Sequence, residues 1–243
     1  MKYSKAEPAG PSLAAECEGI NLYSEHSLHS SLKGLLARPG DRLEARVAGK
    51  VVDLVRSDGE LVEIQTRGLS KIEPKVLALA AAGHKVRVVH PLVAEKTIRR
   101  LDPKTQELVS TRKSPKRLDY YDLFEELARA TGLIAAKGVT IEALLVRSAE
   151  IKLRDGTGSW RRRGDRTLDR ELVEVLGSKS YRTKSQWLGF IPKGLVPPWS
   201  SASLGEALGI ESERARKILY CLAKAGLLAE AGKDGRRKLY EKA

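Results

Sequence analysis

The sequence predicts an α/β protein with a mixed sheet in its first half and a small helical unit with a β-hairpin at its C-terminus. Residues 24–91 show apolar patterns in the order helix, three strands, helix, strand. Prolines cluster at 192–198, ahead of the C-terminal unit. The three strands form an antiparallel meander, which argues against a Rossmann fold.

The elements of the first half follow from spacing and turn residues. Ser24 is expected to cap a helix over 25–37, with Leu28, Leu32, Leu35 and Leu36 on one face. The hairpin turns Ala48-Gly49 and Ser57-Asp58-Gly59 separate the three strands. We expect those strands at 42–47, 51–56 and 61–66, a helix at 70–82, a strand at 86–90, and a hairpin of 94–100 with 107–111.

The second half is less regular. We expect helices at 119–131 and 167–176 and a short helix at 184–190, whereas 140–154 fits either a strand or a helix. These patterns divide the chain into four parts. They are a flexible lead-in over 1–19, an α/β domain over 20–115, a basic, partly helical linking region over 116–198, and the C-terminal unit over 199–243.

Composition limits the setting and the partners. The 243 residues carry a net charge of +13, which favours a polyanionic partner. Cys17 and Cys221 are too few for a disulfide framework and too far apart for a zinc motif. No apolar run approaches the ~18 residues of a membrane span. The N-terminus lacks the pattern of a signal peptide, so we expect a cytoplasmic protein with no membrane partner.

The positive charge is concentrated in the second half. Residues 111–243 hold 27 Lys and Arg against 17 Asp and Glu, which leaves +10 there. Three clusters supply much of it, at 112–117, 161–163 and 236–238. Any one of them alone can be a solvated loop. Together they favour contacts with phosphates, and we expect Arg161, Arg162 and Arg163 to bind nucleic acid.

The C-terminal unit shows a helix, a turn, a second helix and a hairpin. Ser203 and Glu206 fit a capping box for the first helix, which ends at Gly209. The second helix begins near Ser212, and the hairpin pairs 227–231 with 236–241. The apolar pattern of the second helix leaves four residues to face outward or sideways: Arg214, Arg216, Lys217 and Tyr220.

Residues 199–243 resemble the winged helix-turn-helix family in this order of elements. In that family the second helix enters the major groove and the wing contacts the backbone. The resemblance implies that the three basic helix residues face DNA, with Lys233, Arg236 and Arg237 on the wing. A winged helix used for protein contacts or dimerisation is the alternative.

A pair of carboxylates lies in the nearly neutral first half. The turn at 57–59 places Asp53 and Glu63 side by side across a hairpin. Gln65 shares a face with Glu63 because side chains alternate along a strand. Oxygen ligands of this kind suit Mg²⁺.

With Glu25 on the first helix, these residues resemble the PD-(D/E)XK, or restriction-endonuclease-like, nuclease superfamily. Its α-β-β-β-α-β core corresponds to residues 24–91, and its E-x-K motif corresponds to 63–65. The resemblance implies a restriction-endonuclease-like core in which Asp53, Glu63 and the Ile64 carbonyl hold Mg²⁺ or Mn²⁺, contacted by Glu25 through water. It implies a catalytic group of Glu25, Asp53, Glu63 and Gln65 that hydrolyses double-stranded DNA, and it leaves a homodimer open.

One residue departs from that motif. Gln65 stands where the family has a lysine, and Lys71 or Lys75 on the second helix are the candidates to replace it and to contact nucleic acid. His26 and His29 could face the site as a base or ligand, although such residues more often lie on a polar helix face. The alternative function is a catalytically inactive nuclease fold that binds DNA or regulates. A third possibility is an adaptor directed at RNA or protein, and the aromatic content of 5 % argues against a platform that stacks single-stranded RNA.

Overall fold

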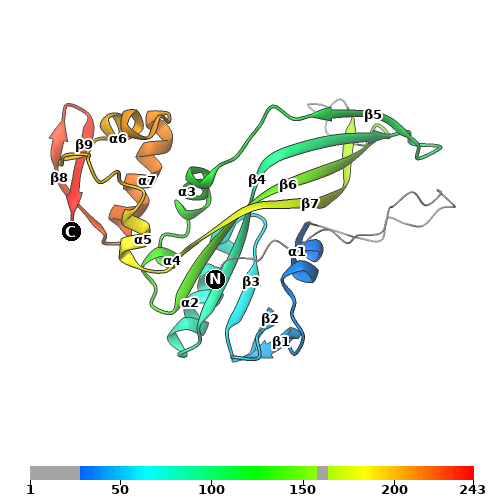
Figure 1. Ribbon diagram of the computed structural model, residues 1–243, viewed down its shortest axis with the longest axis horizontal. Helices are drawn as coiled ribbons and strands as arrows, with labels where there is room; N and C mark the ends of the chain where they lie inside the picture. The colour runs from blue at the N-terminus through cyan, green and yellow to red at the C-terminus, as the bar shows by residue number, and fades with distance from the viewer. Residues whose placement is uncertain (1–27, 158–163) are drawn as a thin grey trace.

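The computed structural model describes residues 28–157 and 164–243 (Figure 1). A seven-stranded mixed sheet runs through the molecule, with helices flanking it. The strand order is β1-β2-β3-β4-β6-β7, and β5 pairs with the outer part of β4. The predicted α/β class with a mixed sheet is therefore confirmed.

The first three strands form the predicted meander. They are β1 (Arg42–Val47), β2 (Lys50–Val55) and β3 (Leu61–Ile64). Both connections contain a glycine with positive φ, Gly49 at 73° and Gly59 at 84°. Glycine adopts this conformation without the steric cost that other residues meet. The register places Leu54 opposite Val62 and Val55 opposite Leu61.

A helical crossover then returns the chain parallel to β3. Helix α2 (Leu69–Ala81) begins after Gly68 and confirms the helix predicted at 70–82. Strand β4 (Val86–Leu101) pairs in parallel with β3 through Leu61–Ile64 and Val86–Val89. The two strands predicted at 86–90 and 94–100 are thus one long strand, and β5 (Leu108–Lys113) forms the expected hairpin with its outer half.

Two further long strands complete the sheet. Strand β6 (Val139–Arg154) runs parallel to β4, which settles the strand-or-helix alternative at 140–154. Strand β7 (Asp165–Tyr181) pairs antiparallel with β6, so the helix predicted at 167–176 is wrong. The outer parts of β4, β6 and β7, with β5, project from the core as an arm (Figure 1). We define the arm as residues 95–113, 147–154 and 165–174.

Short helices pack beyond the strands. The helix predicted at 119–131 is instead the 3-10 helix η1 (Tyr120–Asp122) followed by α3 (Leu123–Leu127), with α4 (Gly132–Ala135) after it. The short helix predicted at 184–190 is α5 (Lys184–Leu188). The C-terminal unit consists of α6 (Ser201–Leu208), α7 (Ser212–Lys224), β8 (Leu228–Asp234) and β9 (Arg237–Lys242).

The first C-terminal helix starts earlier than its predicted cap. Ser200 is the N-cap, and its hydroxyl accepts a hydrogen bond from the Ser203 N–H at 3.1 Å. The Ser203 hydroxyl oxygen in turn accepts a hydrogen bond from the Ser200 N–H at 2.9 Å. The predicted capping box of Ser203 with Glu206 is therefore wrong, because both residues lie inside α6.

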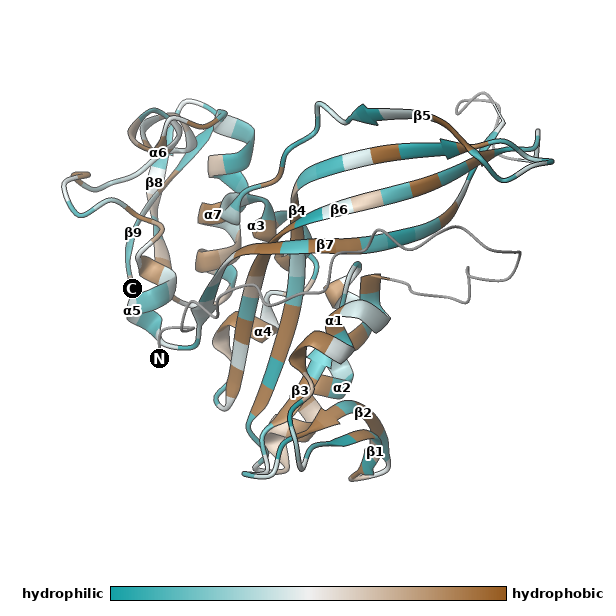
Figure 2. Ribbon diagram, turned by 45° about the vertical axis from the view of Figure 1, so that its right-hand side comes forward, coloured by the Kyte–Doolittle hydropathy of each residue, from teal (hydrophilic) through white to brown (hydrophobic). Residues whose placement is uncertain are grey.

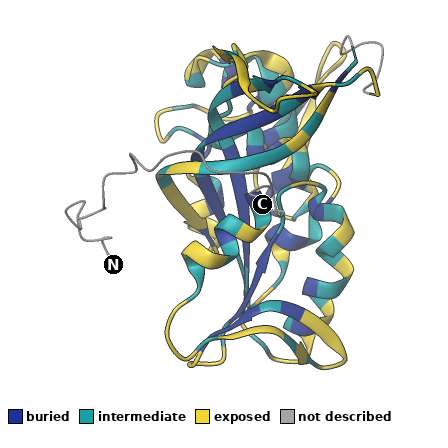
Figure 3. Cartoon of the chain, turned by 90° about the vertical axis from the view of Figure 1, so that its right-hand side faces the viewer, coloured by how far each residue is buried: buried dark blue, intermediate teal, exposed yellow. Residues whose placement is uncertain are grey.

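One hydrophobic core joins the sheet to the C-terminal unit. Phe124 of α3 packs edge-on against Trp187 and Phe190, with ring centroids 6.3 Å and 4.7 Å away. The same cluster includes Val88 of β4 and Ile218 of α7. Residues 116–198, expected to link two domains, instead supply β6, β7 and part of this core. Figure 3 shows the buried positions running along the central strands.

Helix α1 (Leu28–Leu36) covers the other side of the sheet. Leu28 and Leu32 pack in a separate cluster with Leu54, Val62 and Val89. Along the arm, hydrophilic and hydrophobic residues alternate instead of forming continuous hydrophobic runs (Figure 2). Among the described residues, no helix is long and apolar enough to cross a membrane.

Candidate functional site

The two predicted carboxylates face each other across β2 and β3. Continuing the register of Leu54 with Val62 pairs Asp53 with Glu63, as the sequence predicts. On the other side of β2, Leu43 pairs with Leu54 and Ala45 with Val52, so Glu44 lies opposite Asp53. Glu44 has a φ of 49°, which is uncommon for a residue other than glycine. Three neighbouring strands thus carry a row of carboxylates, which we call the carboxylate row: Glu44, Asp53 and Glu63.

Asp53 is held by donors from α1 and β3. Its Oδ2 accepts a hydrogen bond from the Ile64 N–H at 2.8 Å and lies 3.3 Å from His29 Nε2. Burial alone raises the pKa of Asp53. The hydrogen bonds from His29 and Ile64 and the charge of Lys33 outweigh that effect and hold its pKa below the usual value. Asp53 is therefore an anion at neutral pH.

Lys33 of α1 joins two members of the carboxylate row. Its Nζ lies 2.8 Å from Glu44 Oε1 and 3.5 Å from Asp53 Oδ1. Burial lowers the pKa of Lys33, but its contacts with the two carboxylates outweigh burial and raise the pKa above its ordinary value. Lys33 is thus a fixed cation beside Asp53.

Glu63 has its own cation, from the opposite helix. Lys75 Nζ of α2 lies 2.5 Å from Glu63 Oε1. The Glu63 side chain is 5 % exposed, and its burial raises its pKa even though Lys75 acts in the opposite direction. The contact with Lys75 is an ion pair without hydrogen-bond geometry, and Oε1 has no hydrogen-bond partner among the described residues. Of the two lysines expected on α2, Lys75 reaches the site, whereas Lys71 is exposed.

Gln65 lies just past the end of β3. Its side-chain amide donates to the Arg67 carbonyl and, at 3.4 Å, to the Gly68 carbonyl. The main-chain carbonyl of Gln65 accepts a hydrogen bond from His90 Nδ1 at 2.7 Å. The amide group thus braces the loop between β3 and α2. Its predicted role in orienting water or phosphate stays a prediction.

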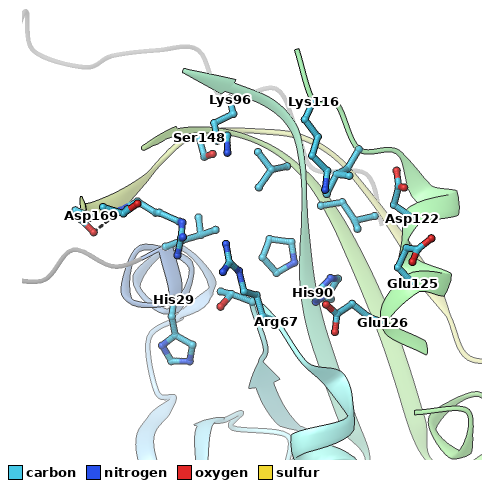
Figure 4. A pocket seen from close by; sticks show the side chains of 18 of the residues that line it. His29, Arg67, His90, Lys96, Lys116, Asp122, Glu125, Glu126, Ser148 and Asp169 are labelled. Carbon is cyan, nitrogen blue, oxygen red and sulfur yellow. Dashed lines mark hydrogen bonds between the residues drawn. The ribbon is translucent and has the colours of Figure 1, made fainter. Parts of the chain in front are cut away.

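A cleft of 840 Å³ (Figure 4) is linked to the carboxylate row through its lining residue His29. His29 contributes to both, because it lines the cleft and contacts Asp53. Glu126, on another wall, accepts hydrogen bonds from the Gly68 and Leu69 N–H groups at 2.7 and 3.1 Å and so caps α2. The charged lining residues are of both signs: Arg67, Lys96, Lys116, Arg170, Arg214, Asp122, Glu125, Glu126 and Asp169.

The donors at the row fit a magnesium ion only in part. Mg²⁺ commonly binds proteins through one or two carboxylates and keeps several waters. Asp53 and Glu63 supply two carboxylates. The N–H and C=O of one strand residue point to the same edge, so the Ile64 carbonyl faces Asp53 as its N–H does. Within residues 28–157 and 164–243, no group of three or more His, Cys, Asp or Glu side chains is placed to hold a metal.

Five predicted or candidate site residues cannot be placed. Glu25, His26 and the cluster Arg161, Arg162 and Arg163 lie outside the described residues. Their predicted roles as catalytic acid, base or ligand, and phosphate contacts stay predictions.

The basic residues of α7 do not all face outward. Arg214 donates to Asp119 and, at 3.1 Å, to Asp122, and Lys217 Nζ lies 2.6 Å from Glu125 Oε1. Arg214 and Lys217 are partly exposed and point sideways, where both bind acidic groups of the segment around η1 and α3. Arg216 is exposed as expected, beside Glu213. DNA binding by the three residues stays a prediction.

A second hollow lies between α7 and β9. Its volume is 600 Å³, and we call it the α7–β9 groove. The predicted wing residues Arg236 and Arg237 line it, whereas Lys233 is exposed elsewhere on the hairpin. The full lining is Ser201, Arg216, Lys217, Leu219, Tyr220, Arg236, Arg237, Lys238 and Tyr240.

Comparison with known proteins places the chain in a family. The fold and the carboxylate row define a mixed α/β protein with a charged site at the end of β3. Residues 26–182 match the family described as Domain of unknown function (DUF8091), and the chain belongs to it. A protein of Treponema pallidum (strain Nichols), described as an uncharacterized protein, is 31 % identical over 224 residues. That alignment covers 92 % of this chain and 87 % of the relative. No solved structure matches.

Sequence reasoning missed Lys33 and Glu44. Lys33 lies one helical turn after His29, a spacing that puts both on one face of α1. Glu44 lies opposite Asp53 in the hairpin of β1 and β2, so the register around the Ala48-Gly49 turn could have indicated it.

Proposed function

We propose that this protein is a metal-dependent DNA endonuclease of the PD-(D/E)XK type. The observation that carries the proposal is the pairing of Asp53 with Glu63 at the end of β3, linked through His29 to the cleft that this histidine lines. Ligands of open α/β sheets commonly bind at the carboxyl ends of the strands. The end of β3 is such a place, because β3 and β4 run parallel there.

The order of elements gives further support. The chain runs α1, β1, β2, β3, α2, β4, which is the order that the resemblance implies. Asp53 on the second strand and Glu63 on the third are the positions of the acids in that family. The proposal thus rests on agreement between the order of elements and the chemistry of these two residues.

Asp53, Glu63 and the Ile64 carbonyl would hold Mg²⁺ or Mn²⁺. When bound, the ion polarises the scissile phosphate and lowers the pKa of a water molecule. Lys75 takes the place of the lysine that Gln65 replaces, because it brings an ammonium group to Glu63. Lys33 adds a second fixed positive charge beside Asp53, where negative charge develops on a phosphate in the transition state.

The C-terminal unit is proposed to hold the nucleic acid. Arg216 of α7 and the hairpin residues Lys233, Arg236 and Arg237 are exposed cations on one unit. Such cations attract phosphates without regard to sequence. The resemblance to a winged helix enters this proposal through the hairpin, which in that family contacts the backbone.

Plasmid cleavage with matched variants tests the chemistry. Wild-type protein with Mg²⁺ or Mn²⁺ is expected to cut DNA. Glu63→Gln is expected to cut about a hundredfold more slowly, as when one transition-state contact is removed. Glu171→Gln is the control, because Glu171 makes an ion pair with Arg99 at 3.1 Å on the arm. Absence of cutting by wild type on supercoiled, linear and single-stranded DNA refutes the proposal, as does equal cutting by Glu63→Gln.

A catalytically inactive nuclease fold that binds DNA is the second candidate. The observation that favours it is the pairing of both acids with lysines, Asp53 with Lys33 and Glu63 with Lys75. Titration calorimetry with Mn²⁺ separates the two. Binding that disappears in Glu63→Gln supports the nuclease, whereas intact DNA affinity without metal binding supports the inactive module.

A further inference from the structure

We propose that the α7–β9 groove binds single-stranded nucleic acid, with a base against Tyr220 and phosphates on Arg236 and Arg237. The inference rests on the proposed function only in taking nucleic acid as the partner. The ligand assigned to the groove is single-stranded, whereas the resemblance to a winged helix does not imply a single strand.

The charge of the groove is of one sign. Five of its nine lining residues are cationic and none is a carboxylate: Arg216, Lys217, Arg236, Arg237 and Lys238. The central cleft, in contrast, is lined by four carboxylates as well as cations. A polyanion therefore meets repulsion from the walls of the cleft that it does not meet in the groove.

Two of the five cations are available for a ligand. Arg236 and Arg237 are exposed and make no ion pair within the described part of the chain. The other three are engaged, Arg216 with Glu213, Lys217 with Glu125 and Lys238 with Glu230. The hairpin arginines are thus the phosphate contacts of the groove.

The groove also offers an aromatic surface. Tyr220 is 42 % exposed, although tyrosine is large and partly apolar. It lies one helical turn from Arg216 on α7, so a ring and a guanidinium group stand side by side. Tyr240 on the opposite side is half-buried, and its main chain pairs with Trp199. A base that stacks on an aromatic ring while its phosphate meets arginine is the usual contact of single-strand binding.

The packing of α7 disfavours a duplex. A helix-turn-helix protein inserts the N-terminal residues of its second helix into the major groove. In this chain Arg214 and Lys217, in the N-terminal half of α7, bind Asp119, Asp122 and Glu125. The segment around η1 and α3 therefore lies where the edge of a duplex would have to enter. A flexible single strand can follow a hollow of 600 Å³ and turn a base toward Tyr220, whereas duplex bases stay stacked.

Fluorescence anisotropy with labelled oligonucleotides tests the proposal. The probes are a thymine DNA strand and a uracil RNA strand of about 20 nucleotides, which exceeds the site of one small binding fold, and a DNA duplex of equal length. EDTA prevents cleavage. We expect at least one single strand to bind about tenfold more tightly than the duplex, the effect of one stacked base. The two single-strand arms distinguish DNA from RNA.

Variants separate stacking from charge. Tyr220→Ala is expected to weaken single-strand binding about tenfold, and Tyr220→Phe is expected to retain it because the ring remains. The double variant Arg236→Gln/Arg237→Gln should also weaken binding. The control Lys104→Gln/Lys137→Gln removes the same charge from exposed residues outside the groove and the basic clusters and should bind as wild type.

Two results overturn the inference. One is duplex binding as tight as or tighter than single-strand binding, and the other is unchanged affinity in Tyr220→Ala. The anisotropy assay is run with EDTA, so it depends neither on cleavage nor on a bound metal. The single-strand proposal can therefore hold even if the cleavage assay refutes the nuclease proposal, and the two failures can be told apart.

Discussion

The charges on the sheet and the charges of the α7–β9 groove are arranged in opposite ways. On the sheet the acids that are buried each face a cation, as with Glu63 and Lys75 or Glu142 and Arg87. In the groove the cations are exposed, and Arg236 and Arg237 have no ion-pair partner in the described residues. The buried charges of the sheet thus pair with one another and stabilise the fold, whereas the groove has cations that can bind a ligand.

This contrast predicts different sensitivities. A buried pair is screened little by salt and responds strongly to the loss of one partner. An exposed cation contributes little to stability, but its contacts with phosphates weaken as salt rises. Mutations on the sheet should therefore change the free energy of unfolding, and mutations in the groove should change binding.

The largest effect is expected at Lys75. Lys75→Met leaves Glu63 buried without its cation and should lower the free energy of unfolding by about 2–4 kcal/mol in urea titrations. Glu63→Gln should cost less, because the Lys75 side chain is 25 % exposed and can turn to water. Because burial already raises the pKa of Glu63, the deficit of Lys75→Met should shrink on acidification as Glu63 takes up a proton. Equal costs for the two variants would contradict this account.

A smaller effect is expected at Glu150 on the arm. Burial raises its pKa, but hydrogen bonds from Lys96 and Thr167 outweigh burial and lower the pKa to about 2. A depressed pKa gives stability that is present above the unfolded value, about 4.3, and is lost as pH falls toward the folded value. Glu150→Gln should therefore be about 2 kcal/mol less stable than wild type at pH 7.

The pH dependence checks that assignment. Unfolding curves of wild type and Glu150→Gln should converge as the pH falls from about 4 toward 2. A difference that is constant over that range would show that the carboxylate charge is not the cause.

The groove should respond to salt instead. Removing two phosphate contacts with Arg236→Gln/Arg237→Gln should reduce the slope of log affinity against log salt by about 1.4 for a single strand. Anisotropy titrations at several salt concentrations measure the slope. The free energy of unfolding should stay at the wild-type value, and a large loss of stability would mean that the arginines are structural.

The smallest effect on stability is expected at Arg216. Its ion pair with Glu213 joins two exposed side chains three residues apart on α7. Arg216→Ala should leave the free energy of unfolding unchanged within the error of a urea titration, because exposed pairs are worth little. A clear loss of unfolding free energy in Arg216→Ala would show that Arg216 stabilises the fold, as the paired residues of the sheet do.

Local sequence was sufficient for the hairpins and for the central acids. Ser57-Asp58-Gly59 marks a turn whose geometry sets the register of the strands on either side, so Asp53 and Glu63 could be paired from sequence. The cations beside these acids were harder to predict from the sequence. Lys75 was one of two candidates on α2. Choosing between those two, like recognising Lys33, requires the angle at which each helix docks on the sheet.

The error at β7 has a similar cause. Residues 167–176 mix leucine and valine with charged residues in a way that fits a helix. They become a strand because β6 pairs with β7 over nearly all of its length, from Ile141 opposite Tyr181 to Arg154 opposite Asp165. Pairing with a neighbouring strand overrides weak local preference.

Phe124 packs against Trp187 and shares a core with Ile218, so the chain cannot be divided after residue 182 without opening that core to water. Cys221 of α7 touches the Phe124 carbonyl across the same junction. The C-terminal unit is therefore not a module that recombination could exchange while leaving the sheet intact. A substitution that improves one part must remain compatible with the other, which ties the two parts together in evolution.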